Sequence, residues 1–65
     1  MQTSELVTLN GWEFDLSAYE NRDHFTHTVW QETFGHYDQI DTTVYAVAVA
    51  NRVESAAKVL WDINQ

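Results

Sequence analysis

The chain of 65 residues has no cysteine, no proline and only two glycines. The absence of cysteine excludes disulfide bonds and thiolate metal sites. A domain this small must therefore be stabilised in another way. No apolar run approaches the roughly 18 residues that a transmembrane helix requires; the longest covers residues 44–50. Residues 1–5 also lack the basic region and apolar stretch of a signal peptide. We therefore expect one intracellular, cytoplasmic domain over residues 1–65.

Basic residues are scarce as well. Three lysines and arginines stand against ten aspartates and glutamates, which gives a net charge of −7 and a pI near 4.4. Such a chain is repelled by phosphate backbones and anionic lipids, and this disfavours direct binding to nucleic acid or to a membrane surface. It is attracted to basic protein surfaces instead. The alternative is that the charge serves solubility, since small domains often carry a net charge of roughly 2–8.

What the chain does contain is aromatic mass: three Trp, three Tyr and three Phe, in a composition that is 45% hydrophobic. Each of these side chains brings a large apolar area to a core. The composition is therefore typical of a globular domain rather than of a disordered segment.

The N-terminal part has the pattern of a β-hairpin. An Asn-Gly dipeptide, preferred in two-residue type I′ turns, separates two alternating segments at about 5–9 and about 12–17. This turn predicts two apolar cross-strand pairs on one face, Leu9 with Trp12 and Val7 with Phe14.

The middle of the chain fits two interpretations. Residues 17–20 have the spacing of a capping box, and Gly35 is a residue that can end a helix. Residues 24–30, however, are mostly β-favouring and include few good helix formers. We therefore predict a third strand over about 24–31, followed by a loop through Gly35, His36 and Tyr37.

The C-terminal part is predicted to be a strand, a capped turn and a helix. Residues 42–50 are rich in β-branched residues and apolar on both faces, which favours an interior strand. Asn51, followed three positions later by Glu54, is a variant of the capping box and predicts a helix over about 52–63. One stripe of this helix is expected to face the core: Val53, Ala56, Ala57, Leu60 and Trp61. The rival interpretation is a single helix over 42–63, because alanine is a good helix former.

Together these elements predict an α+β fold. It is a small antiparallel sheet of three to four strands (about 5–9, 12–17, 24–31 and 42–50) with one C-terminal helix (about 52–63) on one face. Four large apolar residues are expected in the core: Trp12, Phe14, Val47 and Trp61. Since one helix covers one face of a sheet, the other face would be polar or would meet a partner.

Motifs for metal binding and catalysis are weak. His24, His27 and His36 could contribute to a zinc site with Glu20, Glu32 or Asp38, but residues three apart point to opposite faces of a strand, and no HExxH motif occurs. Glu13 and Asp15 would share a strand face that offers no pocket of the kind catalytic carboxylates need. No nucleophile setting and no glycine-rich phosphate loop is present. We therefore expect a protein that is not an enzyme and has no cofactor or resident metal.

In size, acidity and lack of catalytic motifs, the chain is similar to the broad class of phage-encoded inhibitors, which includes anti-CRISPR proteins and DNA mimics. The similarity implies an acidic module that docks on a basic, nucleic-acid-binding surface of a larger protein, in the cytoplasm of the host cell. Dispersed carboxylates would then stand in for phosphates, and aromatic residues of the middle segment would be anchors. The candidate contact residues are Glu13, Asp15, Glu20, Asp23, Trp30, Glu32, Phe34, Tyr37, Asp38 and Asp41.

Two further hypotheses remain. The chain could be a homo-oligomeric structural protein that pairs through its uncovered sheet face or its Ala-rich strand. It could also be a His-dependent metal-binding module. For the aromatic residues of the middle segment, the alternative to a contact surface is a lid over the open sheet face.

Overall fold

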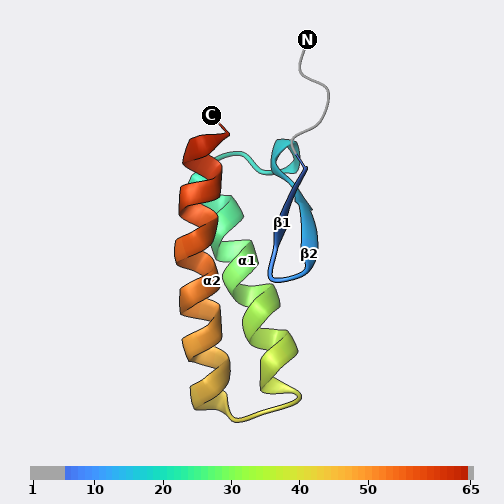
Figure 1. Ribbon diagram of the computed structural model, residues 1–65, viewed down its shortest axis with the longest axis vertical. Coiled ribbons are helices and arrows are strands. Elements are labelled where there is room, and N and C mark those ends of the chain that lie inside the picture. Colours follow the sequence, from blue (N-terminus) through green and yellow to red (C-terminus); the bar gives the residue numbers. More distant parts are fainter. Residues whose placement is uncertain (1–5, 65) are drawn as a thin grey trace.

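The computed structural model describes residues 6–64 as a β-hairpin followed by a pair of long helices (Figure 1). The order is β1 (Leu6–Leu9), β2 (Trp12–Asp15), the short 3-10 helix η1 (Leu16–Ala18), α1 (Arg22–Asp38) and α2 (Thr43–Ile63). The predicted α+β class is confirmed. The predicted number of elements is wrong, because residues 6–64 contain two strands rather than three or four, and two long helices rather than one.

The hairpin forms as predicted. β1 and β2 pair antiparallel, with Leu9 opposite Trp12 and Val7 opposite Phe14. Asn10 and Gly11 have φ of 52° and 87°, the left-handed conformations that a type I′ turn requires at both central positions. The first residue of the predicted strand 5–9 lies outside the described residues, and the last two of the predicted strand 12–17 belong to η1.

α1 replaces the predicted third strand. Residues 24–31 are helical, and so are the residues of the predicted loop through Gly35. The helix is capped by Asn21, whose side chain accepts a hydrogen bond from the backbone N–H of His24, and not by a box beginning at Ser17. The strand prediction is wrong because Phe25, Val29 and Thr33 recur every four residues and bury one helix face. Tertiary burial here overrides a weak β preference.

α2 replaces both the predicted fourth strand, 42–50, and the predicted cap at Asn51. The expected helix over 52–63 is confirmed, but it begins at Thr43, so the single-helix interpretation of this segment is the right one. The N-cap is Thr42, whose hydroxyl oxygen accepts from the backbone N–H of Tyr45 at 3.1 Å. Asn51 lies in the middle of the helix.

The buried positions of α2 form one continuous stripe from residue 46 to residue 57. They are Ala46, Val49, Ala50, Val53 and Ala57. Of the stripe predicted for the shorter helix, Leu60 and Trp61 are half-buried, whereas Ala56 is exposed. None of the helices within residues 6–64 has the length and apolarity that a membrane crossing demands.

The core lies where the two helices and the hairpin meet. Leu9 and Leu16 from the hairpin side pack with residues of both helices, and Phe25 is fully buried. The four residues expected in the core, Trp12, Phe14, Val47 and Trp61, are all half-buried instead. In Figure 1 the hairpin covers the half of the helical pair nearer the C-terminus, and the α1–α2 connection projects beyond it. The sheet is thus a two-stranded ribbon with one face toward the helices, while Thr8 and Glu13 on its other, polar face are exposed.

Candidate binding surface

The negative charge is concentrated in one part of the sequence. Residues 1–41 contain eight carboxylates and one arginine, so they account for the whole net charge of −7. Residues 42–65 contain two carboxylates and two basic residues and are neutral. Because residues 6–41 form the hairpin and α1, whereas α2 begins at Thr43, the fold has an acidic hairpin and first helix against a neutral second helix.

The seven predicted carboxylates are all exposed. They come from β2, from the segment before α1, from α1 itself and from the connection to α2: Glu13, Asp15, Glu20, Asp23, Glu32, Asp38 and Asp41. Three of them have local structural roles. Asp15 accepts from the backbone N–H and the hydroxyl of Ser17, Asp38 accepts from the Thr43 hydroxyl, and Asp41 accepts from the Thr42 N–H.

The side chains of the other four, Glu13, Glu20, Asp23 and Glu32, make no hydrogen bond or ion pair within residues 6–64. The ion pair found within that same part of the chain joins Arg22 of α1 to Asp62 of α2, with 3.2 Å between the guanidinium nitrogen and the carboxylate oxygen. The four unpaired carboxylates are thus available to a partner.

The carboxylates of α1 do not form a single row. Asp23 and Glu32 are nine residues apart, which places them about 180° from each other around a helix of 3.6 residues per turn. Asp38, fifteen residues after Asp23, lies about 60° from Asp23 and about 120° from Glu32 by the same geometry. The carboxylates of α1 therefore lie on two sides of the helix, Asp23 and Asp38 on one and Glu32 on the other, so a contact that uses one side does not meet all three.

The predicted anchors Trp30 and Phe34 are half-buried and stack on each other, with ring centroids 5.1 Å apart and an interplanar angle of 11°. The indole N–H of Trp30 donates to the side-chain oxygen of Asn51 on α2 at 2.8 Å. These two rings therefore lie along the contact between the helices and have a structural role there.

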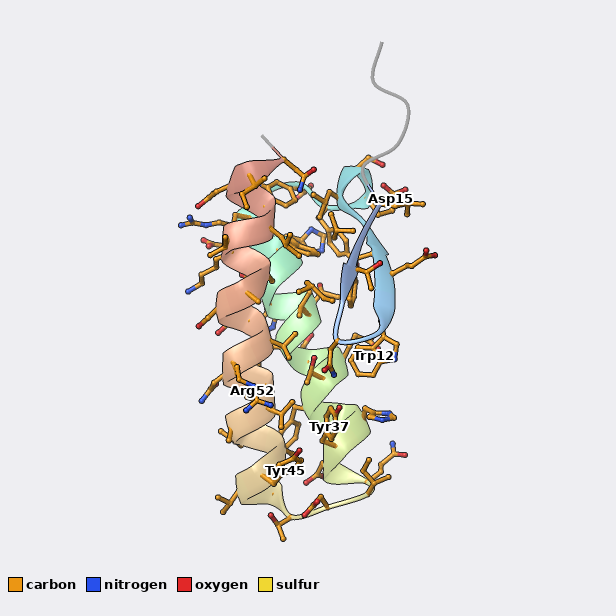
Figure 2. All side chains as sticks on the ribbon, viewed as in Figure 1. Trp12, Asp15, Tyr37, Tyr45 and Arg52 are labelled. Carbon is orange, nitrogen blue, oxygen red and sulfur yellow. The ribbon has the colours of Figure 1, made fainter. Side chains whose placement is uncertain are left out.

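The third predicted anchor, Tyr37, ties three elements together. Its hydroxyl accepts from the side-chain amide of Asn10 at the hairpin turn, at 3.1 Å, and its ring meets that of Tyr45 edge-on at 5.8 Å. In Figure 2, Tyr37 and Tyr45 lie close together below the hairpin, whereas Trp12 lies at its turn and Asp15 at its opposite end. Tyr37 is half-buried, so it too is a structural contact with one side open.

A pocket of about 450 Å³ lies between the second strand and the first helix. Three aromatic side chains line it on one side, Trp12 and Phe14 of β2 and Tyr19 of the following segment. Thr28, Glu32 and His36 of α1 line the other side, at successive intervals of four residues. We call this hollow the β2–α1 pocket.

The walls of the β2–α1 pocket are held in place by ring contacts. The ring of His36 meets Trp12 edge-on at 5.2 Å, and Phe14 and Tyr19 pack against the buried Phe25 with centroids 5.9 and 5.2 Å away. Glu13 also borders the pocket. Because side chains alternate along a strand, however, its carboxylate points away from the face that carries Trp12 and Phe14. Of these two residues, Glu32 is therefore the one whose carboxylate is available to a ligand in the pocket.

The sequence prediction included Glu13 and Glu32 but missed the other residues of the pocket. Trp12 and Phe14 were assigned to the core, and His36 to a loop. The sequence signal that points to these residues is the spacing of Thr28, Glu32 and His36. They share one face only if the segment is helical.

The histidines were the other candidates for chemistry. His24 accepts a hydrogen bond on Nδ1 from the backbone N–H of Glu20, and its ring meets that of Tyr19 edge-on. Among residues 6–64, no three side chains of the metal-binding types come together in a group that could hold an ion.

Three large apolar side chains are exposed on the outer side of α2, in a sector that also carries the exposed Arg52, Ser55 and Asp62. Val44, Val59 and Ile63 are 81%, 57% and 71% exposed, and their spacing places them within about 100° of one another around the helix. This sector is distinct from the acidic surface of α1 and the hairpin.

Comparison with protein-family models, with curated proteins and with solved structures finds no match to this chain.

Proposed function

We propose that the protein is a non-enzymatic acidic binding module that docks on a basic surface of a larger protein through the hairpin and α1. The observation that carries this proposal is the charge distribution: residues 1–41 hold the whole net charge, and all seven candidate carboxylates are exposed. Four of those seven have no partner within residues 6–64. Binding a basic surface would satisfy them, and a charged face also accelerates encounter with such a surface.

A nucleic-acid-binding site is the kind of basic surface that this charge fits best, as in inhibitors of the phage type. Nucleic-acid-binding proteins gather lysine and arginine on one face to bind phosphates. Because Glu32 lies on the opposite side of α1 from Asp23, we propose recognition by a local patch beside β2, rather than imitation of a phosphate row.

The test is a pull-down from a candidate host lysate with the immobilised chain, followed by identification of the bound protein and elution at rising salt. The proposal expects a protein partner that is released as salt increases, since exposed charge pairs are screened beyond about 10 Å at 0.1 M ionic strength. The key variant neutralises the four unpaired carboxylates: Glu13→Gln, Glu20→Gln, Asp23→Asn and Glu32→Gln. It should lose the partner while keeping its helical circular dichroism.

The matched control is Glu54→Gln with Lys58→Gln, which changes two exposed or half-exposed side chains of α2 and leaves the net charge at −7. It should bind as the wild type does. The proposal is contradicted if no salt-sensitive protein partner is found, or if the four-residue variant retains the partner as well as the control does.

A second candidate function, homo-oligomerisation, is favoured by the exposed apolar sector of α2. Val44, Val59 and Ile63 face solvent on a helix whose own charges balance, so a second copy could pack there without the repulsion that the acidic side would cause. Sedimentation equilibrium over micromolar concentrations tests this. A monomer at all concentrations rules it out, whereas a dimer that Val59→Lys dissociates supports it.

A further inference from the structure

We infer that the β2–α1 pocket binds the guanidinium group of an arginine side chain, and that this arginine belongs to the basic surface of the partner. The inference rests on the proposed function for the source of the arginine, but the pocket can be tested without any partner. It assigns a chemical specificity to one place on the acidic surface.

The composition of the walls is the first argument. Trp12, Phe14 and Tyr19 contribute aromatic rings, and Glu32 contributes a carboxylate that has no hydrogen bond or ion pair within residues 6–64. The faces of aromatic rings attract cations, and a carboxylate accepts two parallel N–H bonds from a guanidinium group. The described residues that line the pocket include His36 but no lysine or arginine.

The shape of the pocket is the second argument. Its volume of about 450 Å³ falls within the range of roughly 300–1,000 Å³ typical of ligand pockets. Glu32 and His36 also line a second hollow, of about 400 Å³, on α1. A planar guanidinium on a long apolar stem fits such an aromatic-walled, open-ended site better than a compact, strongly hydrated ammonium group.

Rigidity is the third argument. Phe14 and Tyr19 rest on Phe25, which is fully buried, and the Trp12 ring rests against His36 on α1. The aromatic wall therefore exists before any ligand arrives, and preformed sites lose less conformational entropy on binding.

The experiment is a titration of the isotope-labelled protein with a capped arginine, N-acetyl-arginine-methylamide, followed by NMR at neutral pH. The three tryptophans give three indole N–H signals, which form an internal control. Binding in the pocket should shift the signal of Trp12, while the signals of Trp30 and Trp61, which do not line it, stay in place. Capped lysine should bind more weakly, and capped glutamate should leave all three signals unchanged.

Two variants decide the role of the carboxylate. Glu32→Gln should weaken binding about tenfold, because it removes a charge-assisted pair. The same chemical change on the other helix, Glu54→Gln, should leave binding unchanged, since Glu54 lies outside the pocket. The inference is overturned if arginine shifts all three indole signals alike, if it shifts none, or if the two variants weaken binding equally.

These outcomes are separable from the proposed function. Loss of the pull-down partner with Glu32→Gln alone would support docking of a partner arginine in the pocket, whereas capture that fails only when all four carboxylates are neutralised would support the general acidic surface and overturn the assignment of this arginine to the partner. Arginine binding in the absence of any salt-sensitive protein partner would keep the pocket and overturn the proposed function.

Discussion

The indole N–H of Trp30 on α1 donates a hydrogen bond to the side-chain oxygen of Asn51 on α2, at 2.8 Å. The bond joins two residues that the sequence suggests to be unrelated, one in an interface and the other at a helix cap. It links the middle of α1 to the middle of α2. The stack of Trp30 on Phe34 orients the donor.

This bond predicts an energetic coupling between the two residues. In a double-mutant cycle with Trp30→Phe and Asn51→Ala, we expect a coupling energy of about 0.5–1.5 kcal/mol. Urea denaturation of the four proteins measures it. A cycle of Trp30→Phe with Thr8→Ala, an exposed residue of β1, should give a value near zero. Equal values from the two cycles would mean that the bond contributes nothing to stability.

The second prediction concerns the buried hydroxyl group of Thr33. Thr33 is fully buried, and within residues 6–64 its Oγ1 is the buried side-chain polar atom left without a hydrogen-bond partner. Thr33→Val should therefore stabilise the protein by about 1 kcal/mol, because it replaces an unsatisfied hydroxyl with a methyl group of similar size. Thermal denaturation should show a higher Tm.

The matched control for Thr33 is Thr26, which is also buried in α1 but donates its hydroxyl proton to the backbone oxygen of Asp23 at 3.3 Å. Thr26→Val loses that bond, so it should stabilise less than Thr33→Val or should destabilise. An equal gain from the two substitutions would show that removal of the unsatisfied hydroxyl is not the cause.

The start of α2 makes a third prediction. Thr42 caps the helix, so Thr42→Ala should lower the free energy of unfolding by about 1 kcal/mol. Ser55→Ala, at an exposed position inside the same helix, should be neutral or slightly stabilising because alanine is the better helix former. If the helix instead began after residue 50, Thr42→Ala would not change the free energy of unfolding, and amide exchange would show strand rather than helix protection over 43–50.

The core makes a fourth prediction. Phe25 is fully buried and its ring contacts those of Phe14, Tyr19 and Trp61, so that it joins the hairpin side to both helices. Phe25→Ala should cost about 3–5 kcal/mol, which is a large share of the total stability expected for a domain of this size, about 3–10 kcal/mol. Near-ultraviolet circular dichroism and denaturation curves should show loss of tertiary packing. Val59→Ala, on the exposed side of α2, should cost little.

Local signals in the sequence were sufficient for two parts of this molecule. The hairpin follows from Asn10-Gly11, because a two-residue turn with two positive φ angles sets the register of the strands it joins. The stripe of α2 beyond residue 52 follows from its 3.6-residue period. The acidity of the candidate surface is also a property of composition, and the exposure of all seven predicted carboxylates agrees with it.

The tertiary structure decided the rest. Residues 24–31 and 42–50 favour strands by their β-branched and aromatic content, yet both are helical because each helix buries one face against the other and against the hairpin. Intrinsic propensities differ by less than about 1 kcal/mol per residue, whereas burying one large apolar side chain contributes about 1.5–3 kcal/mol. The β2–α1 pocket exists for the same reason: Glu32 and His36 come to face Trp12 once α1 is a helix and packing has placed it beside the second strand.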